Sequence, residues 1–144
     1  MFFIRHNTPS SKNSKINTSR GSFMSKTVKK YLRAHGIQSF SSRKKEVKPY
    51  KTIPMTFPVD ELRDLFSGIE YPVFVGMHFV RGTRHKADFG NLQQILADLF
   101  VAFEIIEDDN MDCFFAVPFN IDNNWYSYNK DNPGVFIKII NYEI

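Results

Sequence analysis

Apolar runs alternate with polar, turn-forming stretches along the chain, and several of these runs are typical of β-strands. The clearest of these segments extends from Tyr71 to Val80. It is nearly all apolar and is rich in Val and Phe, as expected of a strand covered on both faces. It is therefore predicted to lie in the middle of a sheet. The predicted strands cover residues 2–5, 71–82, 111–119 and 134–142.

A helical pattern covers residues 91–105. At about 100° per residue, one face of this segment gathers the apolar side chains Leu92, Ile95, Leu96, Leu99 and Phe103. A neighbouring polar stripe carries Asn91, Gln94 and Asp98, and Asp88 stands at the N-terminal end. The pattern predicts a helix that packs through one face and offers polar side chains next to it.

Two shorter helices are predicted upstream. One covers residues 25–35 and ends before Gly36, and another follows Pro58 and ends at Gly68. The first has apolar residues on one side and, on the other, the cations Lys29, Lys30 and Arg33. We expect that cationic side to be exposed, where it could face DNA.

Polar stretches connect these elements. Residues 7–24 are predicted to be a basic loop, and residues 37–52, rich in Ser and Lys, a mobile connection that could become ordered on nucleic acid. Residues 120–132 are predicted to be a hairpin-like connection. Together the elements predict one α/β (α+β) domain over residues 1–144, with a small mixed sheet flanked by helices.

Composition narrows the class of protein. With 144 residues, 42% of them hydrophobic, the chain can bury one core. It has no apolar run long enough to span a membrane, and residues 1–4 are too short for the apolar part of a signal peptide, so a cytoplasmic protein is expected. The single cysteine, Cys113, excludes an internal disulfide and a cysteine-based zinc site, and we expect a buried thiol.

The net charge of +4 conceals an asymmetry. Residues 1–51 carry 13 Lys and Arg against Glu46 alone, whereas residues 52–144 carry 6 against 14 Asp and Glu, so the two parts are near +12 and −8. This separation suits a protein that holds phosphates with one part and cations with another. The alternative is a solvated basic face.

Aspartates near the long helix could hold a divalent cation. Asp88 precedes the helix, and Asp108 and Asp109 lie in the loop before the next strand. A hard cation such as Mg²⁺ or Mn²⁺, held by carboxylates, can activate water and stabilise the leaving oxygen in phosphodiester hydrolysis. A helix N-terminus also favours a phosphate. On spacing alone, a helix cap at Asp88 and a solvated turn at the Asp pair are the commoner explanations.

A resemblance to the RusA family of Holliday junction resolvases lies in Asp88-Phe89-Gly90-Asn91-Leu92-Gln93-Gln94, then Asp98, then Asp108-Asp109. The family signature is Asp-x-Asp-Asn-Leu-x-Lys, an Asp further along the helix and an Asp-Asp pair beyond it. The run Pro9-Ser10-Ser11-Lys12-Asn13 after the first strand also resembles the Pro-Pro-Ser-x-Asn loop of that family. The resemblance covers most of the chain, with longer connections at 37–70 and 120–132.

The resemblance implies that Asp88 and Asp109 are catalytic metal ligands, with Asp108 supporting them. Two positions depart from the signature: Gly90 replaces an Asp, and Gln94 replaces the Lys. These changes remove a carboxylate and a positive charge that would stabilise the reacting phosphate. Groups that could compensate are Asn91, which offers a carbonyl oxygen to a metal, Asp112, Arg84, His85 and Lys86.

The function that the resemblance implies is Mg²⁺-dependent resolution of Holliday junctions or other branched DNA in recombination and repair. A homodimer is implied as well, since symmetric cutting needs two equivalent sites. Contacts to phosphates are expected from Lys12, Asn13, Lys15, Arg20, Lys26, Lys29, Lys30, Arg33, Arg84 and Lys86. The alternatives are a relative that binds four-way DNA without cutting it, and a single-strand binding module.

Histidines and aromatic residues are further candidates for chemistry or binding. The histidines His6, His35, His78 and His85 show no metal-ligand spacing. His78 lies in an apolar strand and is predicted to be a core histidine with satisfied hydrogen bonds. The aromatic residues Trp125, Tyr126 and Tyr128 could stack on bases, although packing is the favoured interpretation.

Overall fold

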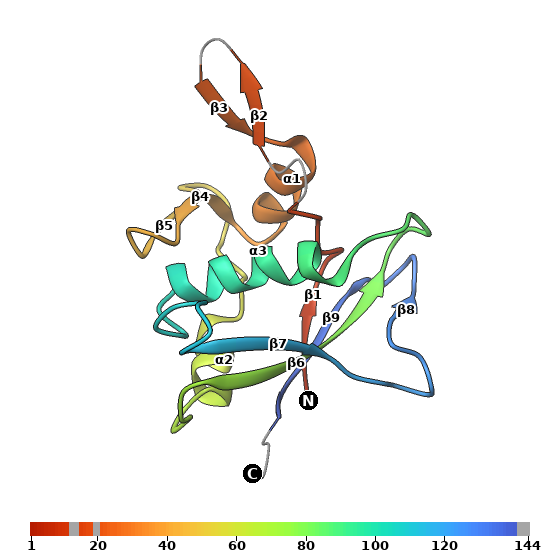
Figure 1. The fold of residues 1–144 in the computed structure, drawn as a ribbon. Coiled ribbons are helices and arrows are strands. Elements are labelled where there is room, and N and C mark those ends of the chain that lie inside the picture. Colours follow the sequence, from red (N-terminus) through yellow and green to blue (C-terminus); the bar gives the residue numbers. More distant parts are fainter. Residues whose placement is uncertain (12–14, 19–20, 141–144) are drawn as a thin grey trace.

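The main sheet is built around the strand β6 (Val73–Arg81). The computed structural model describes residues 1–11, 15–18 and 21–140, and for residues 15–18 and 21–23 the backbone alone. The strand order is β1-β9-β6-β7, and β8 also pairs with β6 (Figure 1). The other strands of this sheet are β1 (Phe2–Arg5), β7 (Phe114–Pro118), β8 (Ser127–Tyr128) and β9 (Gly134–Ile140).

Partners lie on both sides of β6. On one side it pairs antiparallel with β9, from Phe74 to Val80. On the other side it pairs parallel with β7 from Val73 to Met77, and then parallel with β8 at Val80 and Arg81. The prediction of a strand in the middle of a mixed sheet is therefore confirmed.

The long helix α3 (Phe89–Ala102) packs on one face of this sheet (Figure 1). Alternate residues of β6, such as Val75 and Met77, are fully buried and belong to the same core cluster as the helix. The predicted apolar face of the helix is buried throughout: Leu92, Ile95, Leu96, Leu99 and Phe103. Because each large apolar side chain stabilises the fold by about 1.5–3 kcal/mol when buried, this contact fixes α3 on the sheet.

Two shorter helices complete the core where the sequence predicted them. Ser25 caps α1 (Lys26–Ala34), its hydroxyl accepting a first-turn backbone N–H at 3.4 Å. After α2 (Val59–Leu65), the ring of Phe66 lies 5.6 Å from that of Phe100 in α3. Within the described residues, none of the helices is both long and apolar enough to cross a membrane.

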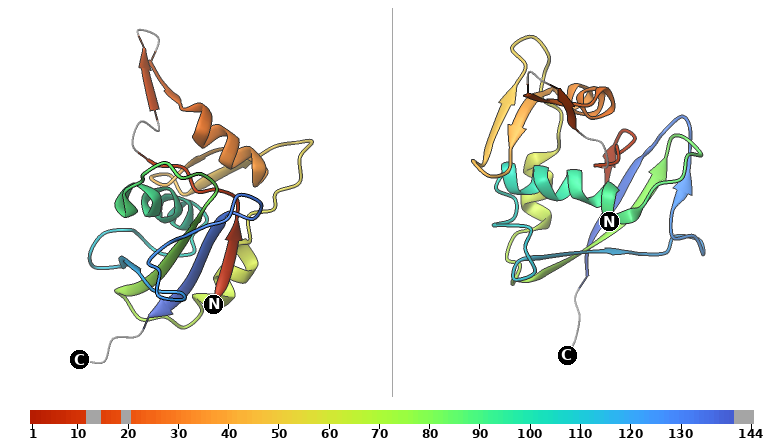
Figure 2. Two further views of the ribbon diagram at one scale, coloured as in Figure 1. Left: turned by 90° about the vertical axis from the view of Figure 1, so that its right-hand side faces the viewer. Right: turned by 45° about the horizontal axis from the view of Figure 1, so that its top comes forward.

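Two stretches predicted to be irregular contain β-hairpins instead. Residues 7–24 include β2 (Lys15–Thr18) and β3 (Gly21–Met24), and residues 37–52 include β4 (Ile37–Ser41) and β5 (Glu46–Pro49). In the second hairpin, which lies near α1 in Figure 2, Phe40 pairs with Val47 and both pack against the core. The prediction was wrong there because a few alternating apolar residues among serines and lysines suffice for a hairpin with one packed side.

The stretch 120–132 is likewise no hairpin between β7 and β9. These strands lie on opposite sides of β6, so the connection passes from one side of the central strand to the other. It contains a β-bridge between Ile121 and Asn124 and the short strand β8. As a result, Tyr126 and Tyr128 line the same cavity as the loop before α3.

Gly36 joins α1 to β4 where two backbone segments meet. Its φ is +75°, in the left-handed region that favours glycine. A Cβ at this position would overlap the backbone carbonyl of Pro54. The backbone carbonyl of Gly36 also accepts a hydrogen bond from the nitrogen of Tyr50 at 3.3 Å. The turn therefore requires glycine for two separate reasons.

Gly36→Ala is expected to lower the free energy of unfolding by about 3 kcal/mol or more, because strain at a positive φ adds to overlap with backbone. Gly68→Ala is the matched control, since Gly68 has φ +72° but a Cβ there would meet nothing within 4 Å. It should cost only about 1 kcal/mol. Urea unfolding measures both variants, and equal losses would contradict a required close approach at Gly36.

Candidate functional site

The loop after β1 docks on the start of α3. The backbone nitrogen of Ser11 donates to the carbonyl of Asn91 at 2.8 Å, and the Ser11 hydroxyl donates to Asn91 Oδ1 at 3.4 Å. At the end of β6, the backbone nitrogen of Gly82 donates to Asn7 Oδ1 at 2.8 Å. The two segments that resemble resolvases, the loop from Pro9 and the motif from Asp88, are therefore adjacent in space.

Asp88 stands at the N-cap position of α3, but its carboxylate makes no cap hydrogen bond. A capping Asp would accept a hydrogen bond from a backbone N–H of the first turn. Instead the side chain is exposed, and its Oδ2 accepts only a long hydrogen bond, of 3.5 Å, from the Asn91 amide. Capping therefore does not explain this residue, and its carboxylate faces solvent next to the positive end of a helix.

Asp109 contacts the middle of α3 through Gln94. The Nε2 of Gln94 donates to Asp109 Oδ2 at 3.1 Å and to Asp98 Oδ1 at 2.9 Å. One neutral amide thus lies between two carboxylates, at the position where the resolvase signature has a lysine. The amide satisfies part of their hydrogen-bonding capacity and adds no positive charge.

Asp108 orders the turn that carries its neighbour. Its Oδ1 accepts a hydrogen bond from the backbone nitrogen of Asp109 at 2.8 Å, and its Oδ2 accepts one from the Asn110 amide at 3.1 Å. Both contacts lie within the loop, as in a side chain that stabilises a turn. Asp108 therefore has a structural role in positioning Asp109.

Asp88 and Asp109 line different cavities. Asp88 borders a cavity of about 500 Å³, whereas Asp109 borders one of about 280 Å³ together with Gly90 and Gln94. At 1.5 Å per residue, Gln94 lies roughly 9 Å along the helix axis from Asp88. Within the described part of the chain, no three His, Cys, Asp or Glu side chains are placed to hold a metal ion. These residues as they stand do not fit a closed Mg²⁺ cage.

Gly90 borders the same cavity as Asp109 and follows Asp88 closely in the sequence. It lies one turn before Gln94 on the same side of α3, and a Cβ there would meet no atom within 4 Å. The fold therefore leaves room for a Cβ at the position where the resolvase signature has an Asp.

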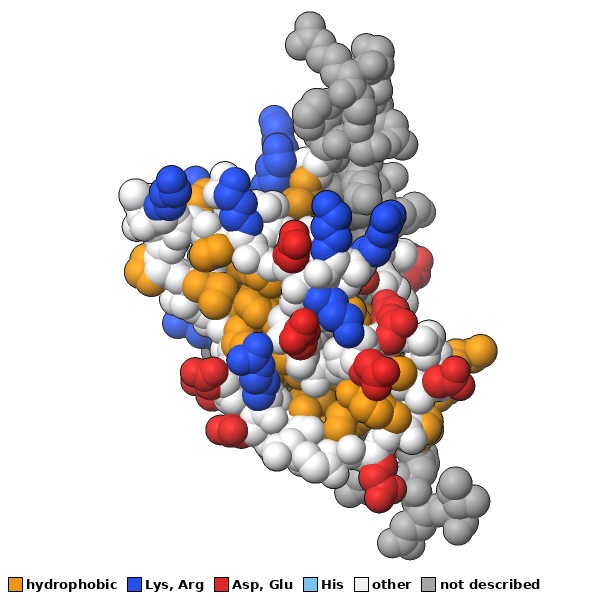
Figure 3. All heavy atoms as spheres, turned by 90° about the vertical axis from the view of Figure 1, so that its left-hand side faces the viewer, with side chains coloured by type: hydrophobic (Ala, Val, Ile, Leu, Met, Phe, Trp, Pro, Cys, Tyr) orange, Lys and Arg blue, Asp and Glu red, His pale blue; other side chains and the backbone are white. Residues whose placement is uncertain are grey.

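Exposed cations gather on α1 and the β4–β5 hairpin. We call this the basic surface, and its residues are Lys26, Lys29, Lys30, Arg33, Arg43, Lys44, Lys45 and Lys48. In Figure 3, Lys and Arg lie mainly over the upper part of the molecule and Asp and Glu mainly over the lower part. The guanidinium of Arg33 lies 5.4 Å from the ring centre of Tyr50, which links the helix to the segment after the hairpin.

The hairpin cations were missed as candidate binding residues, although the run Arg43-Lys44-Lys45 was a visible signal. Of the predicted DNA-binding residues, Lys12, Asn13 and Arg20 lie outside the described residues, and the side chain of Lys15 in β2 is not described. The predicted residues on α1 belong to the basic surface. Arg84 and Lys86 are exposed at a different place, on the loop between β6 and α3.

Two of the histidines, His35 and His78, are buried in the core. His78 is fully buried, and its ring nitrogens contact the carbonyl of Phe119 at 3.0 Å and the hydroxyl of Ser127 at 2.6 Å, so the prediction of a satisfied core histidine is confirmed. The rings of His6 and His35 lie 5.0 Å apart. Burial lowers the pKa of His35 to about 4, so this residue is neutral at physiological pH.

The aromatic residues near β8 are not packed as the favoured interpretation predicted. Trp125 is 61% exposed, Tyr126 67% and Tyr128 40%. The interpretation was wrong because it assumed a hairpin, whereas this connection crosses the sheet and leaves the aromatic rings at its outer edge. The buried thiol of Cys113, in contrast, agrees with the prediction.

No protein-family model, no curated protein and no solved structure matches the chain. The resemblance to the RusA family therefore depends on the motif between Asp88 and Asp109 and on the loop that begins at Pro9.

Gln94→Leu is expected to lower the free energy of unfolding by about 1–2 kcal/mol, because it removes a donor shared by Asp98 and Asp109. Gln93→Leu is the control, since the Gln93 amide donates only to the carbonyl of Gly90 in its own helix, at 3.3 Å. Thermal and urea unfolding at pH 7 compare the two. A cost for Gln94→Leu no larger than that of the control would refute a structural role for the shared amide.

Proposed function

We propose that this chain is a RusA-like protein of the cytoplasm that binds branched DNA. The observation that carries the proposal is the basic surface, because clustered exposed cations on α1 and the β4–β5 hairpin suit sequence-independent contacts with phosphates. Its support from the sequence is the motif from Asp88 to Asp109, which includes the family's Asp-Asp pair. In this proposal the basic surface provides most of the affinity.

The geometry favours binding without cleavage. At Gly90 there is no carboxylate, and the amide of Gln94 is engaged with Asp98 and Asp109. The separation of Asp88 from Asp109 leaves no closed set of metal ligands among the described residues. A protein of this kind recognises the shape and charge of a junction and leaves cutting to another enzyme.

The second candidate function is a Mg²⁺-dependent endonuclease that resolves Holliday junctions. The observation in its favour is the cavity of about 280 Å³ next to Asp109. Mg²⁺ usually keeps several waters and is bound through one or two carboxylates plus substrate phosphates, so a closed protein cage is not required. The resemblance implies Asp88 and Asp109 as ligands, with Asn91 and Asp108 supporting them. Of the two ligands, Asp109 borders this cavity and Asp88 borders the other one, so Asp109 and the substrate phosphate would hold the ion here, and the ion would supply an activated water.

A homodimer is part of both versions. On the sheet face opposite α3, the rings of Phe74 and Phe115 stack at 5.1 Å, and those of Phe3 and Phe136 lie 4.7 Å apart. All four side chains are partly exposed. An apolar sheet face of this kind suits a two-fold contact with a second copy, which would present two equivalent sites to a four-way junction.

The deciding experiment is a gel shift and a cleavage assay on one synthetic four-way junction, with linear duplex as the control, in Mg²⁺ and in Mn²⁺. We expect salt-sensitive binding that favours the junction, with no nicks. Paired symmetric nicks would establish the endonuclease instead. Equal affinity for duplex and junction would refute both versions.

Replacing Lys29 and Lys30 together with Ala should weaken junction binding and reduce the slope of log K against log salt by about 1–2, since each phosphate contact contributes about 1. Lys130→Ala is the control, because Lys130 is exposed but lies outside the basic surface. Fluorescence anisotropy at several salt concentrations provides the slopes. An effect of Lys130→Ala as large as that of the double variant would argue against this surface.

Gly90→Asp combined with Gln94→Lys should introduce Mg²⁺-dependent nicking of the junction, which the natural chain is expected to lack, because both changes restore electrostatic groups near the phosphate. A Cβ at Gly90 would meet no atom within 4 Å. Adding Asp109→Asn to the double variant should abolish the gain. A double variant that makes no more nicks than the natural chain would show that cleavage does not depend on a carboxylate at position 90 and a lysine at position 94.

A further inference from the structure

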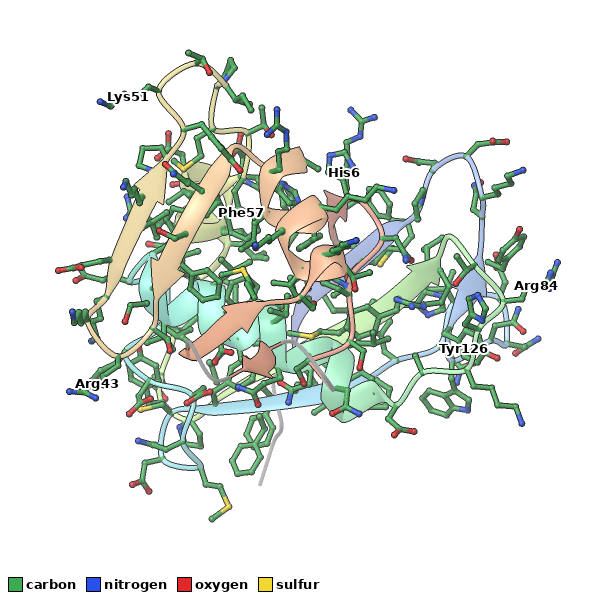
Figure 4. The ribbon with its side chains drawn as sticks, turned by 90° about the horizontal axis from the view of Figure 1, so that it is seen from above. His6, Arg43, Lys51, Phe57, Arg84 and Tyr126 are labelled. Carbon is green, nitrogen blue, oxygen red and sulfur yellow. The ribbon has the colours of Figure 1, made fainter. Side chains whose placement is uncertain are left out.

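A cavity of about 500 Å³ lies where the end of β6, the loop before α3 and the segment around β8 meet. Its charged and aromatic lining includes Arg81, Arg84, Lys86, Asp88, Tyr126 and Tyr128. Figure 4 shows Arg84 and Tyr126 at the same end of the molecule, far from Arg43 on the β4–β5 hairpin. This cavity is therefore separate from the basic surface.

Arg81 places a buried positive charge at the wall of the cavity. The residue is only 9% exposed, and its Nη1 donates to the backbone carbonyl of Thr8 at 2.6 Å. Among the described residues, its Nε has no hydrogen-bond partner and no carboxylate forms an ion pair with it. Buried charges in proteins are normally paired, so this guanidinium can take an anion as a further partner.

Exposed aromatic rings form the outer side of the cavity. The guanidinium of Arg84 lies 4.0 Å from the ring centre of Tyr128, a cation–π contact that holds the cation at the rim. Tyr126 lines the same cavity and is 67% exposed. An exposed ring next to a fixed cation is the arrangement that stacks a base and holds its phosphate.

The charges in the cavity indicate where an anion would bind. Arg81, Arg84 and Lys86 outnumber the single carboxylate, Asp88, so the cavity carries a net positive charge. A phosphate would lie toward the arginines and away from Asp88, because like charges repel. The base would then point toward the tyrosines.

We propose that this cavity binds one unpaired nucleotide of a DNA strand, with the base on Tyr126 and the phosphate against Arg84 and Arg81. The proposal rests on the proposed function for the source of the strand, since a branch point supplies nucleotides that are not stacked in duplex. It assigns the aromatic residues near β8 a role in recognition that the basic surface does not provide.

The test is anisotropy with fluorescein-labelled oligo(dT) and with a duplex of equal length. Tyr126→Leu should lower affinity for the single strand at least about fivefold, whereas Tyr126→Phe should retain it, because only the π-face is needed. Trp125→Leu is the matched control, since Trp125 is an equally exposed neighbour that does not line the cavity. Arg84→Gln should weaken single-strand binding and reduce its salt dependence.

Duplex binding should be unchanged in Tyr126→Leu, since duplex contacts are assigned to the basic surface. The proposal would be overturned if Trp125→Leu and Tyr126→Leu lowered the affinity for single strand equally, or if Tyr126→Leu left that affinity unchanged. Competition by free dTMP as effective as that by oligo(dT) would also overturn it, in favour of a mononucleotide site. Failure of the proposed function would give a different result: the natural chain would bind the four-way junction no better than linear duplex.

Discussion

The pairing of β6 on both of its sides is the constraint on which the candidate sites depend. Because β9 holds one side and β7 and β8 hold the other, the end of β6 at Arg81 is fixed in position. Residues 82–88 connect the end of β6 to α3, and burial of the helix face on the sheet sets the rotation of the helix. Gly90 and Gln94 lie within α3 and Asp88 at its N-cap, so their places relative to the sheet follow from the packing of this helix.

Much of this architecture could be predicted from the chain alone. The apolar run of β6 and the helical spacing of α3 are strong local signals, and both elements lie where the pattern placed them. The β4–β5 hairpin was missed because its apolar residues are few and its serines and lysines dominate the composition. The path from β7 to β9 was missed for a different reason: strand order depends on contacts between distant segments, which periodicity does not report.

The sequence predicted which residues belong to the candidate site, but it did not predict how their side chains are arranged. Spacing brought Asp88, Asp109 and the polar stripe of α3 into one group, and the structure does place Gln94 and Asp98 next to Asp109. What spacing could not show is that Asp88 opens to a different cavity, since that depends on the direction of side chains around the helix. The exposure of Tyr126 was hidden for the same reason, because it follows from the route of a connection across the sheet.

The open space at Gly90 has an evolutionary consequence. A glycine codon ending in a pyrimidine becomes an aspartate codon through one base change, and a glutamine codon becomes a lysine codon through one base change as well. A Cβ at Gly90 would meet no atom within 4 Å, so the first of these steps does not place a Cβ against a neighbouring atom. With a glycine codon of that kind, two base changes would separate this chain from the Asp and the Lys of the RusA signature, and both changes would fall on one side of a single helix whose packed face they leave untouched.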